Sequence, residues 1–275
     1  MATGVVANTN VSSLQASRIL ARNRQGLEKA MERLSSGKRI NTAADDATGM
    51  AVAAKIRADV RSLDQAVRNA NDGISFINTY DGAASEIEGI LVRMRELATQ
   101  AQSGTYTTND LAHADAEFVQ LAAEITRISD NTQWNGMSVL ASATTYTFQV
   151  GSGSTSTSSV DVTFQDMDAT TLGVGSLAVS SNTAAQSAIS SIDAAITTVD
   201  TFRATLGAKI NRMESAATNL ANVSMNTAAS RSRIEDADYA QATTELARTQ
   251  IIQQAATAML AQANQQPQSV LSLLK

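Results

Sequence analysis

Residues 56–101 read IRADVRSLDQAVRNANDGISFINTYDGAASEIEGILVRMRELATQA, and this stretch decides the fold. Its apolar residues recur at spacings that alternate between four and three: Ile56, Val60, Leu63, Val67, Ala70, Ile74 and Ile77, then Tyr80, Ala84, Ile87, Leu91, Met94, Ala98 and Ala101. Residues at these spacings share one helix face, and such a long seam packs as a coiled coil does. The single slip around Tyr80 is what a local overwinding of the supercoil needs. The stretch therefore predicts a helix of roughly 60 residues, about 90 Å long, packed against other helices.

Helical patterns also lie on both sides of this stretch. Leu14 to Ser36 is predicted to form a helix that ends at Gly37, a residue suited to a left-handed cap. The long helix is predicted to begin near Thr42, a candidate N-cap with Asp45 three residues later. Further helices are predicted at 109–130, from Asn182 onward, and at 234–263.

The middle of the chain has a different pattern. Tyr146, Phe148 and Val150 alternate with polar residues, and the same alternation returns from Val160 to Phe164. Such alternation is typical of half-buried strands, so we expect one antiparallel hairpin with a Ser/Thr-rich tip at 152–159. The predicted fold is mainly α: a long antiparallel coiled-coil-like helical bundle with a small β-hairpin in the middle of the chain.

The composition argues against several classes of function. Hydrophobic residues make up 43% of the chain but aromatics only 4%, and there is one proline. Small apolar side chains suit packed helices better than a large ligand pocket. The net charge of −5 is spread along the chain, so neither a nucleic-acid surface nor a polybasic membrane patch is indicated. No run of apolar residues reaches the length of a membrane span.

Catalytic and metal-binding motifs are missing from the sequence. His113 is the single histidine and there is no cysteine, so neither a two-histidine zinc motif nor a thiolate site can form. His113 lies in a helical pattern without a nucleophile turn nearby, which indicates a solvated or packed helical side chain. We expect no enzyme activity, no cofactor and no metal.

Several blocks of sequence carry a family resemblance. They are ERLSSGKRIN at 32–41, DDATGMA at 45–51, RNANDGIS at 68–75, SRSRIEDADYA at 230–240, and the final stretch with LAQANQ at 260–265 and VLSLLK at 270–275. In this order they resemble the two conserved ends of bacterial flagellins. The resemblance covers about residues 1–140 and 185–275, and only about 40 residues stand where many flagellins insert large outer domains.

The resemblance implies a domain organisation and a role. Residues 1–41 and 234–275 would be inner terminal helices, 42–143 and 182–233 an outer helical domain, and 144–181 a hairpin or variable segment. The role is a structural subunit that polymerises into the flagellar filament outside the cell. Export would use the flagellar type III apparatus, without a cleaved signal peptide and with the help of a flagellin chaperone. The filament cap and the junction proteins would be further partners.

Two sets of site residues follow. The resemblance implies that Arg93, Leu97 and Glu117 match contacts read by the innate receptor Toll-like receptor 5, although Leu97 is equally interpretable as a packing residue. The apolar pattern predicts an assembly stripe in which two terminal helices meet, made of Leu20, Leu27 and Leu34 with Leu246, Ile252, Ala256 and Met259.

Two other functions fit parts of this pattern. A hook–filament junction protein shares both flagellin ends, but the block at 270–275 favours the filament subunit. A cytoplasmic coiled-coil binding module also has heptads, but it would remain a small oligomer when concentrated.

Overall fold

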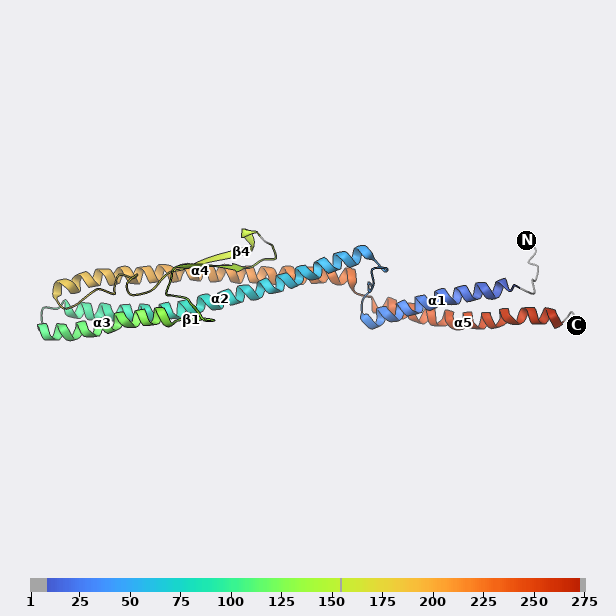
Figure 1. The fold of residues 1–275 in the computed structure, drawn as a ribbon, viewed down its shortest axis with the longest axis horizontal. Coiled ribbons are helices and arrows are strands. Elements are labelled where there is room, and N and C mark those ends of the chain that lie inside the picture. The colour runs from blue at the N-terminus through green and yellow to red at the C-terminus, as the bar shows by residue number, and fades with distance from the viewer. Residues whose placement is uncertain (1–8, 154, 273–275) are drawn as a thin grey trace. The chain divides into compact units, whose positions relative to one another are not determined.

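The computed structural model describes residues 9–153 and 155–272, and the chain divides into two compact units. We call Asp59–Met225 the central unit, and Met1–Ala58 with Asn226–Lys275 the terminal unit. The helices are α1 (Val11–Ser36), α2 (Ala47–Ala101), α3 (Thr108–Asn131), α4 (Asn182–Glu235) and α5 (Tyr239–Ser272) (Figure 1). The mainly helical bundle with strands only in its middle is the fold that the sequence predicts, and the long helix α2 has 55 residues. Each unit is described below by itself.

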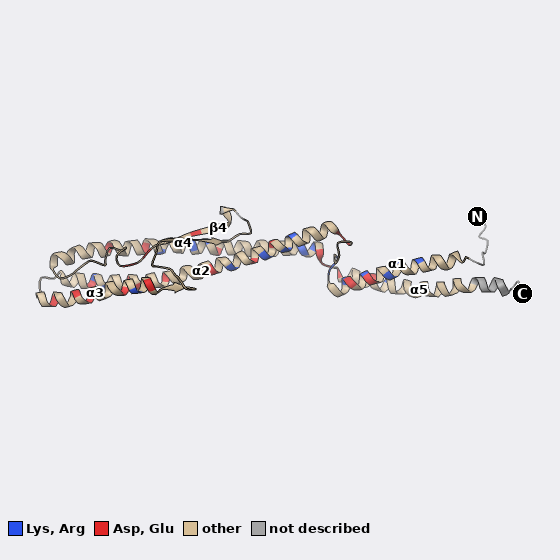
Figure 2. Cartoon of the chain, in the orientation of Figure 1, with Lys and Arg blue, Asp and Glu red and all other residues tan. Residues whose placement is uncertain are grey.

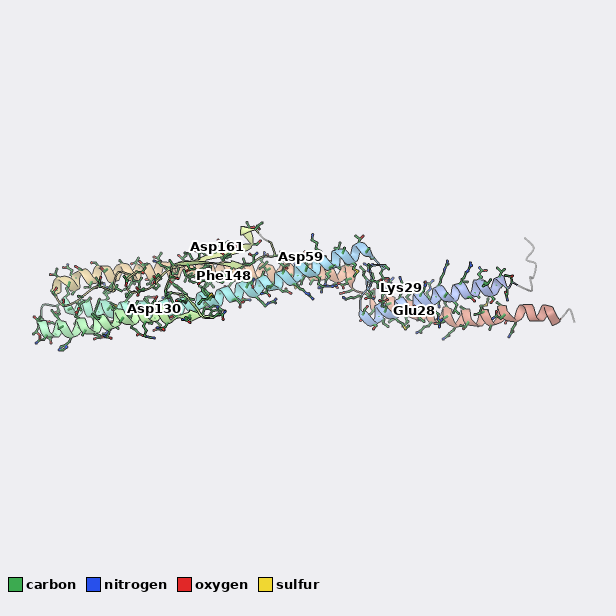
Figure 3. All side chains as sticks on the ribbon, viewed as in Figure 1. Glu28, Lys29, Asp59, Asp130, Phe148 and Asp161 are labelled. Carbon is green, nitrogen blue, oxygen red and sulfur yellow. The ribbon has the colours of Figure 1, made fainter. Side chains whose placement is uncertain are left out.

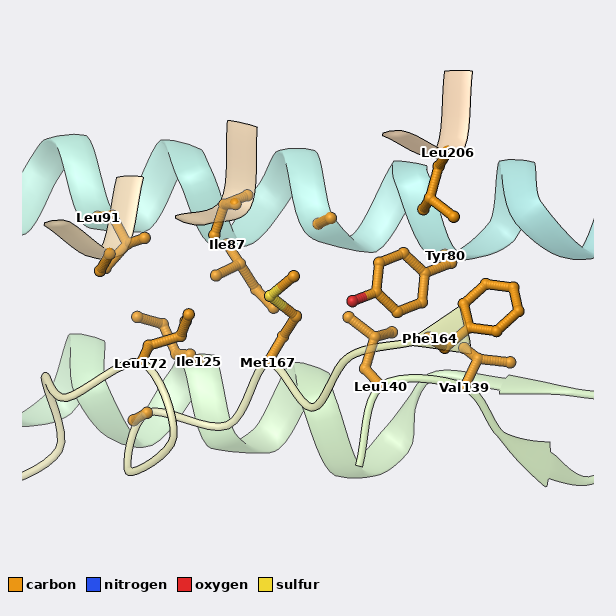
Figure 4. Packing of buried hydrophobic residues seen from close by; sticks show 14 of the residues in the cluster. Tyr80, Ile87, Leu91, Ile125, Val139, Leu140, Phe164, Met167, Leu172 and Leu206 are labelled. Carbon is orange, nitrogen blue, oxygen red and sulfur yellow. The ribbon is translucent and has the colours of Figure 1, made fainter. Parts of the chain in front are cut away.

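The core of the central unit is built on the predicted seam of α2. Ile77, Tyr80 and Ala84, where the heptad spacing slips, are all fully buried. Together with Ile87, Leu91 and Met94 they pack against α3, α4 and the chain that joins them (Figure 4). Helices α2 and α4 run antiparallel, because Asp64 accepts a hydrogen bond from Ser224 at 2.7 Å whereas Arg95 pairs with Asp193 at 2.6 Å.

A predicted hairpin covers part of this core. Strands β3 (Thr144–Gln149) and β4 (Ser159–Phe164) pair antiparallel, so the predicted hairpin is confirmed. Phe164 is fully buried, and its ring centroid lies 4.9 Å from that of Phe76 and 5.1 Å from that of Tyr80. The chain after β4, residues 165–181, also supplies buried residues, among them Met167, Leu172, Val174 and Val179.

A second, smaller hairpin was not predicted. Strands β1 (Gln133–Trp134) and β2 (Met137–Ser138) pair across Asn135 and Gly136, whose φ angles are 50° and 78°. Two successive residues with positive φ are what a type I′ turn requires, and Asn-Gly is its preferred pair. That dipeptide was the available sequence signal for this hairpin.

The ends of the helices confirm some predicted caps and correct one. Gly37 has a φ of 69° and donates its N–H to Arg33, as the predicted left-handed cap requires. The prediction that Thr42 is the N-cap of the long helix is wrong. Thr42 and Asp45 close a turn on each other, whereas the Gly49 N–H donates to the carboxylate of Asp46 just before α2. Asp46 therefore occupies the capping position.

The boundary between the last two helices lies a few residues further along the chain than the sequence predicts. Helix α4 continues to Glu235 and α5 begins at Tyr239, whereas the pattern placed the start of the last helix near Ile234. The break is made by the chain after α1. The Ala237 N–H donates to the Gly37 carbonyl and the Arg39 N–H to the Glu235 carbonyl, at 2.9 and 2.7 Å. A contact between distant segments ends the helix here, not a glycine or proline.

Across the described ranges, none of the helices combines the length and the apolar character that crossing a membrane takes.

Candidate assembly surface

The terminal unit is an antiparallel pair of α1 and α5 with the connecting turns, the first turns of α2 and the last turns of α4. Asn10 donates a side-chain hydrogen bond to the Ala263 carbonyl at 2.7 Å, and Asn23 donates to the Thr249 carbonyl at 2.8 Å. Among the residues that the structure describes, the buried apolar residues of this unit are Ala30, Ile40, Ala53, Ala242 and Ala256. A pair whose buried residues are mostly alanine removes little apolar surface from water. The two helices therefore have little core of their own.

The predicted assembly stripe lies mainly along the seam of this pair. The half-buried members on α1 are Leu20, Leu27 and Leu34. The half-buried members on α5 are Leu246 and Ile252, and Ala256 on the same helix is buried. Met259 is different, since its side chain is 66% exposed. The half-buried residue at this level of α5 is Leu260 instead.

Apolar side chains are also exposed around the pair. In the described part of the chain, the large apolar residues exposed on these two helices are Val11, Leu14, Ile19 and Met31 on α1 and Tyr239, Ile251 and Met259 on α5. A groove of about 350 Å³ runs between the helices, lined by Ser12, Gln15, Ala16, Ile19, Ile252, Ala255, Ala256 and Met259. Exposed apolar side chains gathered on one pair of helices mark an interaction surface.

Charge is scarce on α5. Glu245 and Arg248 are the only charged residues in its sequence, and the described part of the helix beyond them is coloured as uncharged in Figure 2. Amides replace the charges, including Gln250, Gln253, Gln254, Gln262 and Gln265. Depletion of charge is typical of surfaces that become buried in an interface, whereas the amides on this helix can also hydrogen-bond water.

A buried carboxylate connects three chain segments near the end of the pair where α1 ends and α5 begins. The Oε1 atom of Glu235 lies 2.6 Å from Lys38 Nζ and 2.6 Å from Arg57 Nη2, and the Glu235 side chain is only 7% exposed. The hydrogen bond from Lys38 holds the pKa of Glu235 below its ordinary value, with Arg57 adding to the effect against the opposing effect of burial. Sequence reasoning missed this cluster because its three members are far apart along the chain.

The residues that match receptor contacts lie on the central unit. Arg93 on α2 pairs with Glu117 on α3 at 2.9 Å and with Glu96 at 3.1 Å, and these charges are exposed. Leu97 is only 3% exposed and belongs to the core. Arg93, Leu97 and Glu117 nevertheless line one groove of about 400 Å³ between α2 and α3. The structure therefore brings the three residues together, with two of them at the surface and one beneath it.

His113 lies on the exposed face of α3. Over residues 9–153 and 155–272, no group of three or more Asp, Glu or His side chains is arranged to hold a metal ion.

Comparison with known proteins identifies the family of this chain. Residues 7–145 match the family model of the bacterial flagellin N-terminal helical region, and residues 189–274 match that of the C-terminal helical region. A flagellin of Halalkalibacterium halodurans is 46% identical over 272 residues, which cover 98% of this chain and 100% of that protein. A flagellin of Bacillus subtilis is 39% identical over 303 residues, covering 98% of this chain and 99% of that protein.

A solved structure shows the same fold at greater distance. A protein described as flagellar hook-associated, from Vibrio parahaemolyticus, superposes with a TM-score of 0.59 at 10% identity, covering 70% of this chain and 100% of that one. At this identity the likeness concerns the fold alone. The matched family models and the relatives over nearly the whole chain show that this protein belongs to the bacterial flagellins.

Proposed function

We propose that the α1/α5 pair, with its groove and its exposed apolar residues, is the surface through which this flagellin packs against further copies of itself. The chain is a structural subunit that polymerises into the flagellar filament, outside the cell. The observation that carries the proposal is the contrast between the two units. The central unit buries whole rows of large side chains, whereas the described terminal unit buries mainly alanine and leaves Ile19, Ile251 and Met259 exposed.

The same contrast leads to a mechanism in which the two ends become fully ordered on assembly. An isolated helix pair with a small core gains little to offset the entropy of ordering its chain. Neighbouring subunits would cover the apolar residues that the pair leaves exposed. The amide-rich face of α5 would then face the wet channel of the filament, because amides tolerate water and carry no charge.

Limited proteolysis of monomer and filament tests this mechanism. Sites in residues 9–40 and 240–265 should be cut quickly in the monomer and resist in the filament, while the central unit resists in both. Leu27→Asp should abolish seeded growth because it puts a charge into the seam, and Leu27→Met should grow normally because it keeps an apolar side chain of similar volume. Equal protease resistance of the ends in both states would overturn the mechanism.

The division into inner and outer domains that the sequence predicts is part of the same proposal. The terminal unit as defined by compactness ends at Ala58 and resumes at Asn226, whereas the sequence places the inner helices at 1–41 and 234–275. We assign the inner helices to subunit packing in the filament and the remaining helices to an outer layer. The role needs no catalytic step and no cofactor.

Export and further partners are also proposals. We infer export through the flagellar type III apparatus with a flagellin chaperone, and contacts with the filament cap and the junction proteins. Such export needs a chain that is threaded unfolded, which the small core of the terminal unit favours. Cells that lack the export apparatus should retain the protein inside.

Arg93, Leu97 and Glu117 are proposed to form a contact site for Toll-like receptor 5. Arg93 and Glu117 present their charges at the rim of the α2/α3 groove, and Leu97 supports the groove from beneath. Arg93→Ala should weaken activation of receptor-bearing cells by the monomer. Arg127→Ala is the matched control, because Arg127 forms a similar exposed ion pair with Glu124 on α3. Equal activation by both variants and the parent would refute the contact.

A further inference from the structure

The methionines that the structure describes range from fully buried to largely exposed, with Met31, Met50 and Met137 between 42% and 48% exposed. Met94, Met167 and Met213 are fully buried in the central unit, whereas Met225 and Met259 are 64% and 66% exposed. An exposed thioether is open to oxidants in solution, and a buried one is shielded by its neighbours. Met259 is thus among the accessible methionines, and it also lines the apolar groove between α1 and α5.

The surroundings of Met259 are apolar on both helices. Ala16 and Ile19 lie across the groove on α1, and Ile252 and Ala255 line it on α5. Ser12 and Gln15 are the polar residues among the groove's lining. A thioether fits these neighbours well because it is polarizable and flexible. A polar group in the same place has few hydrogen-bond partners once water is excluded.

We propose that Met259 is an oxidation site through which peroxides stop the free subunit from assembling. The sulfur lone pair attacks one oxygen of hydrogen peroxide, the O–O bond breaks, and an S=O bond forms. The sulfur loses two electrons, and the peroxide is reduced to water. The product, a methionine sulfoxide, is polar where the thioether was apolar.

The effect on assembly follows from burial. This step rests on the proposed use of the α1/α5 surface as a subunit contact. In the free subunit the sulfoxide is hydrated whether or not the α1/α5 pair is fully ordered, so the folded central unit is unaffected. In the filament the neighbouring copy would strip that water, and burying an unpaired polar group lowers an association constant by about tenfold or more.

The same geometry makes the modification specific to subunits that have not assembled. Once a neighbouring copy covers the groove, the Met259 sulfur is shielded from peroxide. Existing filaments should therefore survive an oxidative pulse that stops their growth. Sulfoxide reductases that act on both epimers should restore growth, because the modification is reversible.

The experiment uses the full chain. Monomer is treated with hydrogen peroxide, the oxidised methionines are identified by peptide mass spectrometry, and elongation from filament seeds is measured by light scattering. Three variants are treated in parallel: Met259→Leu, Met225→Leu and Met31→Leu. Met225 is the matched control, because it is nearly equally exposed but is not among the residues that line the groove.

The expected result is that oxidised parent, Met225→Leu and Met31→Leu lose elongation about tenfold or more, while oxidised Met259→Leu loses much less, because Met31, although exposed on α1, does not line the groove. Reductase treatment should restore the parent. Elongation of the oxidised parent at the untreated rate would overturn the proposal. So would a loss of elongation in oxidised Met259→Leu as large as that of the oxidised parent, or protection by Met31→Leu instead.

Two untreated variants separate this inference from the proposed function. Met259→Gln mimics the polarity of the sulfoxide and should elongate poorly, with a circular dichroism spectrum like that of the parent. If Leu27→Asp fails to elongate while Met259→Gln and the oxidised parent elongate normally, the oxidation site is refuted and the assembly surface stands. If Leu27→Asp also elongates normally, the assembly surface itself is refuted.

Discussion

Two glycines inside α2 should respond to the same substitution in opposite directions. Gly73 is buried beneath the β3/β4 hairpin, whereas Gly82 is exposed. A Cβ added at Gly73 would lie 2.9 Å from Cδ1 of Phe148, which Figure 3 labels, and 3.1 Å from Sδ of Met213. Within the described part of the chain, a Cβ at Gly82 meets no atom within 4 Å. The pair therefore separates helix propensity from packing.

The magnitudes follow from these distances. Alanine is favoured over glycine in a helix interior by about 1 kcal/mol, so Gly82→Ala should stabilise the central unit by about that amount. Gly73→Ala has the same gain, but overpacking a well-packed site costs about 1–3 kcal/mol. The Phe148 ring also packs near Phe76, with ring centroids 6.0 Å apart, so moving it would disturb that contact. Gly73→Ala should therefore range from neutral to about 2 kcal/mol destabilising.

Thermal unfolding followed by tryptophan fluorescence measures the difference. Trp134 is the only tryptophan, and its ring lies 6.2 Å from Phe76, so it reports on the central unit. At 2–4 °C per kcal/mol for a domain of this size, the midpoints of the two variants should differ by roughly 2–12 °C. In a Phe148→Ala background the ring is gone and the contact with Met213 remains, so Gly73→Ala should destabilise less than it does with Phe148 present. If Gly73→Ala is as stabilising as Gly82→Ala with Phe148 present, the packing argument is wrong.

Three further results are expected. The pKa of Glu235 is lowered in the folded state, so the stabilisation from its ionised carboxylate is complete above the ordinary pKa of 4.5 and is lost as the pH falls through the folded-state pKa. Below pH 4.5, the protease resistance of the terminal unit should therefore fall less in Glu235→Gln than in the parent. Arg203→Ala should lower the free energy of unfolding of the central unit by about 1 kcal/mol in urea, since the half-exposed Arg203 bridges Asp81 and Glu88 on α2; an unchanged urea midpoint would contradict this. An insertion of a few residues at Ser156, at the tip of the β3/β4 hairpin, should leave filaments intact under the electron microscope, and loss of filaments would place that tip in a subunit contact.

Much of the fold was predictable because its signals are local. The heptad spacing of 56–101 is read directly as a helix face, and the structure buries that face from Leu63 to Ala101. The alternation around Tyr146 and Phe148 identified a hairpin, and Gly37 identified a helix end. The flagellin blocks at both ends indicated the family, which the comparisons confirm.

Other features depended on contacts between distant segments. Nothing near Asp236 breaks a helix by itself, and the end of α4 comes from hydrogen bonds to the chain around Gly37. Gly73 looks like an ordinary helical glycine until Phe148 is placed above it. The sequence also could not tell Met259, which is exposed in a groove, from a methionine in the seam.

The sequence by itself thus determined which segments are helices and strands, and to which family they belong, because periodicity and turn residues act within a few positions. The tertiary structure decided which face of α5 is left uncovered, where α4 ends, and which charges meet at Glu235. These outcomes depend on the rotation and register of helices whose partners lie far away in the chain. A repeat of small apolar residues defines a helix face, but only the packed partner determines which residues of that face are buried.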